Sequence, residues 1–169
     1  MKSLNQNIVF IGFMGCGKSS IAKAVSQQTG CLFVDTDGLI EMSENKKIKD
    51  IFQENSEKYF RECEKKVFDF LLPTKNVCIS VGGGFPIYIN HSLKSLGVIV
   101  YLKKSFDAII SSLTQKDIDN RPLLKDIDRA KKIYESRIKL YEKQADVILD
   151  ITHQDINEVC LDIVDKLKI

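Results

Sequence analysis

One segment near the N-terminus combines residue types and spacing that bind phosphate groups. It spans residues 12–19, which read Gly-Phe-Met-Gly-Cys-Gly-Lys-Ser, and it fits the pattern GxxxxGK[ST] at every fixed position. The apolar run Ile8–Ile11 precedes it and a helical pattern begins at Lys18, which is the context in which such a loop binds nucleoside triphosphates. The alternative is a chance glycine-rich turn between a strand and a helix, and the complete motif in its complete context argues against it.

The chemistry of this loop explains its composition. Glycines allow the backbone to fold tightly around an anion and to direct successive N–H groups at phosphate oxygens, and the helix N-terminus adds partial positive charge. We expect Lys18 to reach the β- and γ-phosphates and the Ser19 hydroxyl to bind Mg²⁺. The predicted contacts to ATP are Gly15, Cys16, Gly17, Lys18, Ser19 and Ser20. The motif predicts a nucleotide and a magnesium ion but leaves the phosphate acceptor open.

Two carboxylates follow the second apolar run of the chain. One residue separates Asp35 from Asp37, so an extended backbone places both side chains on the same side. At the carboxyl edge of a parallel sheet, one carboxylate could hold Mg²⁺ through water while the other contacts an acceptor hydroxyl. In the alternative interpretation, which the pair alone favours, Asp37 caps a helix at Gly38–Glu44 and Asp35 is a turn residue.

Three consecutive glycines, Gly82–Gly84, follow the third apolar run. Residues without side chains allow a ligand to approach the backbone N–H groups closely. The alternative is a flexible turn before Pro86, and the triplet alone does not decide between the two. No aspartate ends the third run, so Asp35 is the better candidate for a magnesium carboxylate, with Ser80 at most a supporting residue.

The elements that must position these residues alternate between short apolar runs and longer helical patterns. Near-continuous apolar runs are typical of parallel strands covered on both faces, and their alternation with helices predicts an α/β fold. The predicted strands are Ile8–Ile11, Cys31–Val34, Val77–Val81, Val98–Leu102 and Val147–Leu149. The predicted helices are Lys18–Thr29 before Gly30, Ser56–Leu72 and Ser105–Leu113 with serine N-caps, Ile127–Ala145, and Ile156–Leu167 behind an Asp155/Glu158 capping box. Two short helices are expected within Asp37–Asn55, and a mobile loop over Thr114–Asp126.

Length and composition are those of a single globular domain, residues 1–169. The chain is 44% apolar and 28% charged, and its net charge of +2 does not suggest a nucleic-acid or membrane partner. Its five cysteines lack the spacing of metal ligands, which predicts reduced thiols and a cytoplasmic location. We see no signal peptide and no run near the ~18 apolar residues of a membrane span. Without a long apolar stripe on its surface, the chain is expected to be a monomer.

The order of the motifs resembles the shikimate kinase family. It runs from the phosphate loop through DTD, IFQENSEKYFRECE, GGG and RPLL to RIKLYEKQA. The resemblance implies a P-loop NTPase-like, three-layer fold with a five-stranded parallel sheet, a substrate-binding segment at about residues 37–62 and a lid at about residues 114–126. It also implies transfer of the γ-phosphoryl group of ATP to the 3-hydroxyl of shikimate, within aromatic amino-acid biosynthesis.

The resemblance also implies roles for individual residues around the reacting groups. Ser19 and Asp35 would bind Mg²⁺. Asp37 would hydrogen-bond the reacting hydroxyl and act as its base. Arg121, on the lid, would close over ATP and join Lys18 in neutralising the phosphates.

The resemblance also implies that two arginines and a glycine bind the rest of the shikimate molecule. Arg61 and Arg137 would grip the carboxylate, and the backbone of Gly83 would contact the ring. Only four of the 25 basic residues are arginines, and a planar fork binds a carboxylate in a way that lysine does not. As alternatives, Arg61 pairs with Glu57 at i+4 on an exposed helix face, and Arg137 lies on a solvated face.

Several neighbouring residues depart from the family pattern or have open roles. Thr114 stands near the place of a second arginine that stacks on adenine. Glu64 could orient Arg61 or contact substrate, and Phe52 and Phe60 could form an apolar wall or belong to the core. Two other classes of protein remain as alternatives: another small-molecule kinase, acting on gluconate or a nucleoside monophosphate, and a non-catalytic nucleotide-binding module.

Overall fold

Five parallel strands form one sheet in the order β2-β3-β1-β4-β5 in the computed structural model, which describes residues 6–89, 93–119 and 122–169. Arg121, predicted on the lid, lies outside the described residues. The strands are β1 (Asn7–Ile11), β2 (Leu32–Asp35), β3 (Val77–Ser80), β4 (Gly97–Lys103) and β5 (Val147–Asp150). The five predicted strands are thereby confirmed, each within a residue or two of its predicted bounds.

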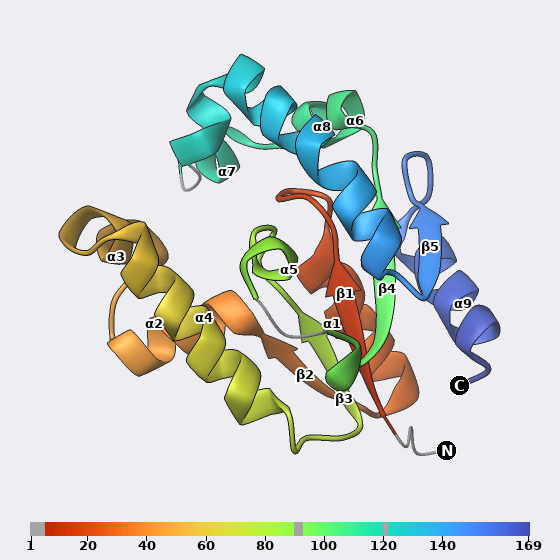
Figure 1. Ribbon diagram of the computed structural model, residues 1–169. Coiled ribbons are helices and arrows are strands. Elements are labelled where there is room, and N and C mark those ends of the chain that lie inside the picture. The colour runs from red at the N-terminus through yellow and green to blue at the C-terminus, as the bar shows by residue number, and fades with distance from the viewer. Residues whose placement is uncertain (1–5, 90–92, 120–121) are drawn as a thin grey trace.

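Helices flank the sheet and crowd around its carboxyl edge (Figure 1). The α-helices are α1 (Lys18–Thr29), α2 (Thr36–Glu44), α3 (Ile48–Glu54), α4 (Glu57–Leu71), α5 (Phe85–Tyr88), α6 (Phe106–Ser112), α7 (Gln115–Asp119), α8 (Ile127–Gln144) and α9 (Ile156–Leu167); the 3-10 helices are η1 (Leu93–Ser95) and η2 (Pro122–Lys125). Figure 1 shows α2, α3 and α4 grouped on one side of this edge, and α6 and α7 on the other. Among the helices that the structure describes, none has the length and apolarity to cross a membrane.

The position of β1 in the sheet creates the crevice where ligands bind in open α/β folds. All five residues of β1 are buried, and the strand pairs with β3 on one side and β4 on the other. From β1 the chain crosses through α1 to β2, two places away, and later reaches β4 on the opposite side. Ligands bind at such a switch point, outside the carboxyl ends of the strands. The phosphate loop follows β1 at this point.

Local side-chain chemistry sets the helix ends that the sequence predicted. The Ser56 hydroxyl accepts a hydrogen bond from the backbone N–H of Tyr59 at the start of α4. Ser105 caps α6 in the same way. A capping box between Asp155 and Glu158 opens α9, and Gly30, with a φ of 74°, is the C-cap that follows the last residue of α1, Thr29. These caps confirm the predicted helix boundaries, because each depends on residues a few positions apart.

The prediction of a loop over Thr114–Asp126 was wrong, since its described residues include α7 and η2. The carboxylate of Asp117 accepts hydrogen bonds from the Thr114 hydroxyl, at 2.6 Å, and from the Thr114 backbone N–H. The backbone N–H of Asp117 donates back to the Thr114 hydroxyl, at 3.3 Å. Leu124, in η2, is buried. The reciprocal bonds between Thr114 and Asp117 therefore stabilise α7, and burial of Leu124 stabilises η2, although the segment is polar.

The expectation that both faces of every strand are covered was wrong for the sheet edges. Leu32 at the start of β2 is 70% exposed, and Ile148 in β5 is also exposed. Both strands are edge strands of the sheet, so fewer elements cover them. The central strands β1 and β3 are buried along their whole length, as the apolar runs predicted.

Candidate active site

The phosphate loop joins β1 to α1, and the side chain of its lysine lies across the backbone of the loop. Gly15 and Gly17 have φ angles of 78° and 97°, in the left-handed region that glycine adopts without strain. Lys18 is buried, and its Nζ donates hydrogen bonds to the carbonyl oxygens of Gly12 and Phe13, both at 2.9 Å. The ammonium group is therefore desolvated but paired, at the N-terminus of α1.

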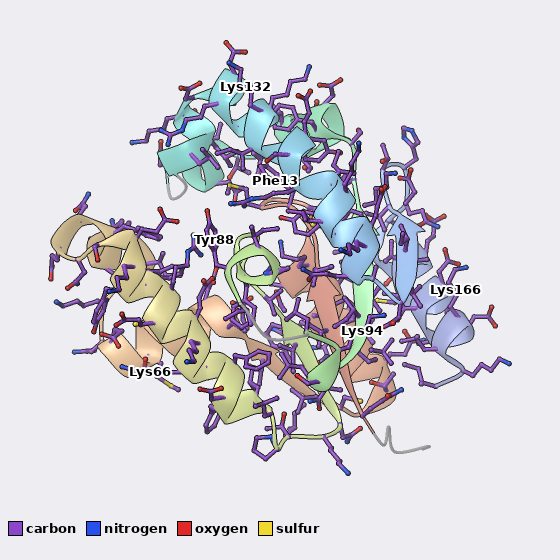
Figure 2. The ribbon with its side chains drawn as sticks, viewed as in Figure 1. Phe13, Lys66, Tyr88, Lys94, Lys132 and Lys166 are labelled. Atoms are coloured by element: carbon purple, nitrogen blue, oxygen red, sulfur yellow. The ribbon has the colours of Figure 1, made fainter. Side chains whose placement is uncertain are left out.

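Aromatic packing fixes the outer part of the phosphate loop. The ring of Phe13, labelled in Figure 2, meets the rings of Tyr134 and Phe106 edge to face, with centroids 5.3 and 6.4 Å apart. Cys16 is buried, and its backbone N–H donates to the carbonyl of Phe13. The loop is thus anchored to α6 and α8.

Ser19, Asp35 and Ser80 bring three oxygen atoms together beside the loop. The Ser19 hydroxyl donates to Oδ2 of Asp35 at 2.6 Å and lies 3.1 Å from the Ser80 hydroxyl. Asp35 and Ser80 are register partners on β2 and β3, which explains why they meet. The described residues contain no group of three or more His, Cys, Asp or Glu side chains suited to a metal. This donor set fits Mg²⁺, which usually takes one or two protein oxygens and completes its shell with phosphate and water.

Asp35, and not Asp37, caps the helix that follows β2. Oδ1 of Asp35 accepts from the backbone N–H groups of Asp37 and Gly38, at 3.0 and 3.3 Å, and α2 begins at Thr36. The alternative in which Asp37 is the cap is therefore wrong. The cap leaves Oδ2 of Asp35 directed at Ser19 and leaves the Asp37 carboxylate for other partners.

The Asp37 carboxylate faces the cleft in an environment that disfavours its charge. The pKa of Asp37 is raised from 3.8 to about 6, first by burial and second by the nearby charge of Asp35, against the opposing charges of Lys18 and Arg61. A carboxylate with a pKa near 6 is ionised at neutral pH and is still a useful proton acceptor. Asp37 therefore offers the cavity a carboxylate that can accept a proton.

Arg61 and Glu64 form a buried ion pair one turn apart on α4. Nη1 of Arg61 donates to Oε2 of Glu64 at 2.7 Å, and Nη2 donates to Oε1 of the exposed Glu57 at 2.8 Å. Glu64 is only 1% exposed, and burial raises the pKa of its carboxyl to about 7 against the opposing effect of Arg61. The i+4 pair that was the alternative role of Arg61 is present, together with a second, buried pair.

The charges of two more residues affect the pKa of the Glu64 carboxyl group. The Asp37 charge raises the pKa of Glu64, and the Arg137 charge lowers it. Arg137 is half-buried on α8 and also lies close to Tyr141. The structure thus brings Asp37, Arg61 and Arg137 into one electrostatic cluster, although they come from α2, α4 and α8.

Each glycine of the triplet faces a different part of this site. A Cβ atom added to Gly82 would lie 2.7 Å from Oδ1 of Asp37. One added to Gly83 would lie 3.2 Å from the backbone nitrogen of Met14 in the phosphate loop, and one added to Gly84 would lie 3.0 Å from Nη1 of Arg61. The triplet ends in a turn at Gly83 and Gly84 that leads into α5, as the alternative predicted, and the turn is closely packed against these groups.

A cavity of about 280 Å³ joins the phosphate loop to the carboxylates and the triplet. Its lining includes Lys18, Ser19, Asp35, Asp37, Gly83 and Asp117. Arg61 and Arg137 are not among the residues that line this cavity. Phe60 is buried against Phe52, with ring centroids 4.6 Å apart, and Phe52 is 42% exposed.

Sequence reasoning missed the contacts of Gly82 and Gly84 and the contact between Arg61 and Tyr88 in α5. The Cζ atom of Arg61 lies 3.7 Å from the centroid of the Tyr88 ring. The run of three glycines was a signal that several groups crowd this segment, but it did not say which groups. An aromatic residue four positions after the triplet had no local pattern that could identify its partner.

Comparisons with known proteins identify the family and the fold of the chain. The family model described as shikimate kinase matches residues 14–168. A shikimate kinase from Clostridium botulinum is 40% identical over 154 residues, which cover 89% of this chain and 91% of the relative. The solved shikimate kinase from Aquifex aeolicus is 31% identical with a TM-score of 0.80, covering 96% of both chains. The shikimate kinase from Acinetobacter baumannii in complex with shikimate shares the fold, with a TM-score of 0.88 at 24% identity and coverage of 98% of this chain and 94% of that one.

Proposed function

The chain belongs to the shikimate kinase family, and we propose that the cleft beside its phosphate loop is where it transfers the γ-phosphoryl group of ATP to the 3-hydroxyl of shikimate. The products are shikimate 3-phosphate and ADP, within aromatic amino-acid biosynthesis. One observation carries the assignment of the site. The phosphate-binding Lys18 and the carboxylate of Asp37 line a single cavity, so a phosphate donor and a hydroxyl acceptor can meet there.

The phosphate loop is proposed to bind ATP through Gly15, Cys16, Gly17, Lys18, Ser19 and Ser20. Ser19 and Asp35 would hold Mg²⁺, which neutralises the charge that develops on the phosphate oxygens. Lys18 would exchange its two carbonyl partners for the β- and γ-phosphates. The Lys18 side chain lies across the loop, with Nζ bonded to the carbonyl oxygens of Gly12 and Phe13.

Asp37 is proposed to orient the reacting hydroxyl and to accept its proton. The hydroxyl oxygen forms a bond to the γ-phosphorus while the bond from that phosphorus to the β,γ-bridging oxygen breaks, and ADP leaves with the bridging oxygen. The pKa of Asp37, about 6, supports this role, because the carboxylate is charged at neutral pH yet takes up a proton readily. Lys18, Asp37 and Arg121 are the proposed catalytic residues.

Arg61 and Arg137 are proposed to bind the carboxylate of shikimate, with the backbone of Gly83 against the ring. Support comes from the charges of the two guanidinium groups, both of which lower the pKa of the buried Glu64 carboxyl. An arginine fork forms two parallel hydrogen bonds with a carboxylate, which adds orientation to charge. Residues 37–62 would then form the substrate-binding segment of a single domain that spans residues 1–169.

Residues 114–126 are proposed to act as the lid, with Arg121 closing over the phosphates. Closure would exclude water, which otherwise competes with the acceptor for the phosphoryl group. We also propose that the enzyme works as a monomer in the cytoplasm. The five cysteines support a reducing compartment, since all of them are free and buried.

Measurement of ADP release tests this function directly. The assay supplies ATP and Mg²⁺ with shikimate, gluconate or a nucleoside monophosphate, and it is repeated with excess EDTA. We expect strong stimulation by shikimate alone and loss of turnover on chelation. Stimulation by gluconate or a nucleotide but not by shikimate would overturn the acceptor. Lack of stimulation by any acceptor would instead favour a nucleotide-binding module.

A further inference from the structure

The guanidinium group of Arg61 is held on three sides by side chains of two helices. Glu64 and Glu57 accept hydrogen bonds at its Nη1 and Nη2 edges, both from α4. On the third side, the Cζ atom of Arg61 lies over the Tyr88 ring, from α5, 3.7 Å from the ring centroid. Figure 2 labels Tyr88 on the side of α5 that faces α4. The Nε atom of Arg61 is buried and has no hydrogen-bond partner in the described part of the chain.

Gly84 provides the space for this stack. A Cβ atom at Gly84 would lie 3.0 Å from Nη1 of Arg61, 3.3 Å from Nη2 and 3.4 Å from Cε2 of Tyr88. Any side chain at this position would push the guanidinium group or the ring aside. The contact between Arg61 and Tyr88 is therefore part of a fitted arrangement and not a chance approach of two surface side chains.

The segment that bears Tyr88 is joined to the helix that bears the other arginine. The Tyr141 hydroxyl on α8 donates to the carbonyl of Gly83 at 2.6 Å, and Nε2 of Gln144 on α8 donates to the carbonyl of Pro86 at 2.7 Å. These two bonds anchor the triplet and α5 to α8, which also carries Arg137. Through its contact with Arg61, Tyr88 thus connects α4 to α8, the helix that carries Arg137.

We propose that Tyr88 is a positioning residue that sets the plane of the Arg61 guanidinium relative to Arg137, so that the two bind the acceptor's carboxylate together. The inference rests on the proposed function. A cation over an aromatic face is attracted by the ring. The ring leaves the Nη1 and Nη2 groups at the guanidinium edges, where the acceptor's carboxylate would bind beside Glu64 and in place of the exposed Glu57. Because the ring and Glu64 already restrict Arg61, less side-chain freedom is lost when the carboxylate binds.

The ring of Tyr88, and not its hydroxyl, makes this contact. Tyr88 is 44% exposed, and its hydroxyl makes no hydrogen bond within the described residues. Tyr88→Phe should therefore keep the function, whereas Tyr88→Ala and Tyr88→Leu should lose it. The leucine variant retains apolar volume beside α4, so it separates loss of the ring from loss of packing and provides a second variant if the alanine variant is unstable.

Steady-state kinetics of these variants test the proposal. A cation–π contact is worth about 0.5–2 kcal/mol, so Tyr88→Ala and Tyr88→Leu should raise the KM for shikimate by roughly 2–30-fold. The KM for ATP should stay within about twofold, and Tyr88→Phe should match the wild type. Phe70→Ala, which removes an exposed ring from the far part of α4, is the matched control and should change neither constant.

A double-mutant cycle separates positioning from general stability. In an Arg61→Ala background, Tyr88→Leu should raise the KM for shikimate by much less than in the wild type, because its effect passes through Arg61. An equal rise in both backgrounds, an unchanged KM in the single variant, or a phenylalanine variant as impaired as the leucine one would overturn the proposal. Failure of the wild type to phosphorylate shikimate would overturn the proposed function instead, so the two failures are distinguishable.

Discussion

The two glycine-rich segments of the cleft use glycine for different physical reasons. In the phosphate loop, Gly15 and Gly17 adopt φ angles of 78° and 97°, which other residues reach only with strain. In the triplet, no residue has such an angle, yet an added Cβ would meet Asp37 at Gly82 and Arg61 at Gly84. The loop needs glycine for its own backbone, and the triplet needs glycine for its neighbours.

This difference divides the site into two halves. The proposed phosphate half is one continuous stretch of chain, in which the backbone conformation itself would bind the anion. The proposed acceptor half gathers side chains from α2, α4 and α8 around a segment that has little space for side chains. Substitutions in the acceptor half should therefore affect the acceptor and the chemistry while leaving ATP binding nearly intact.

The largest expected effect is that of Asp37→Asn, which keeps the shape beside Gly82 but removes the proposed base. We expect kcat to fall by about 10²–10⁴-fold, the usual contribution of a general base. The KM for ATP should change little, since Asp37 lies on the acceptor side. Turnover measured with saturating ATP and shikimate provides the test, and an unchanged kcat would remove Asp37 from the mechanism.

Gly82→Ala should displace the Asp37 carboxylate without changing Asp37 itself. The new Cβ would lie 2.7 Å from Oδ1 of Asp37, so the carboxylate must move, and we expect kcat to fall by roughly tenfold or more because such small displacements of catalytic groups are costly. Gly38→Ala is the matched control, since its Cβ would meet only Cβ of Asp35 at 3.8 Å. If Gly82→Ala raises the KM for ATP as strongly as it lowers kcat, the division into two halves does not hold.

Arg137→Lys should show whether the acceptor half recognises a carboxylate. Lysine keeps the charge but loses the planar fork, so the KM for shikimate should rise by about tenfold with ATP binding unchanged. Arg129→Lys, at an exposed position on the same helix, is the control. An equal loss with a carboxylate-free analogue of the acceptor would argue against this role.

The smallest effect expected is on stability, and it has the opposite sign to the effect on activity. The pKa of Asp37 is raised to about 6 in the folded state, so its contribution favours folding below pH 3.8 and is lost as the pH rises through about 6. Above that pH the native state carries a disfavoured charge, which Asp37→Asn removes. We expect a gain on the order of 1–3 kcal/mol, or a few degrees in Tm, at pH 8 and almost none at pH 4.

Thermal unfolding at the two pH values measures this gain. Asp69→Asn, which neutralises an exposed carboxylate on α4, is the control and should leave Tm nearly unchanged. A lower Tm for Asp37→Asn at pH 8 would mean that the carboxylate stabilises the fold, and its raised pKa would then need another explanation.

Features that depend on neighbouring residues could be predicted from the sequence. The five strands follow from apolar runs, and the ends of α1, α4, α6 and α9 follow from caps a few residues away. The segment after Thr114 was mispredicted, because its polar composition indicated a loop while the reciprocal bonds between Thr114 and Asp117 favour a helical turn. The identity of the phosphate loop required no tertiary information, since its motif specifies its own backbone conformation.

The sequence by itself determined the phosphate loop, the parallel sheet and the set of polar residues around the cleft. Only the tertiary structure decided that Asp35 caps α2 and thereby leaves Asp37 for the cleft, and that burial raises the pKa of Glu64. It also decided that Tyr88 stacks on Arg61 through the space left by Gly84. The physical reason is distance along the chain. Backbone conformation and caps are set within a few residues, whereas burial, charge coupling and ring stacking depend on which distant segments the fold packs together.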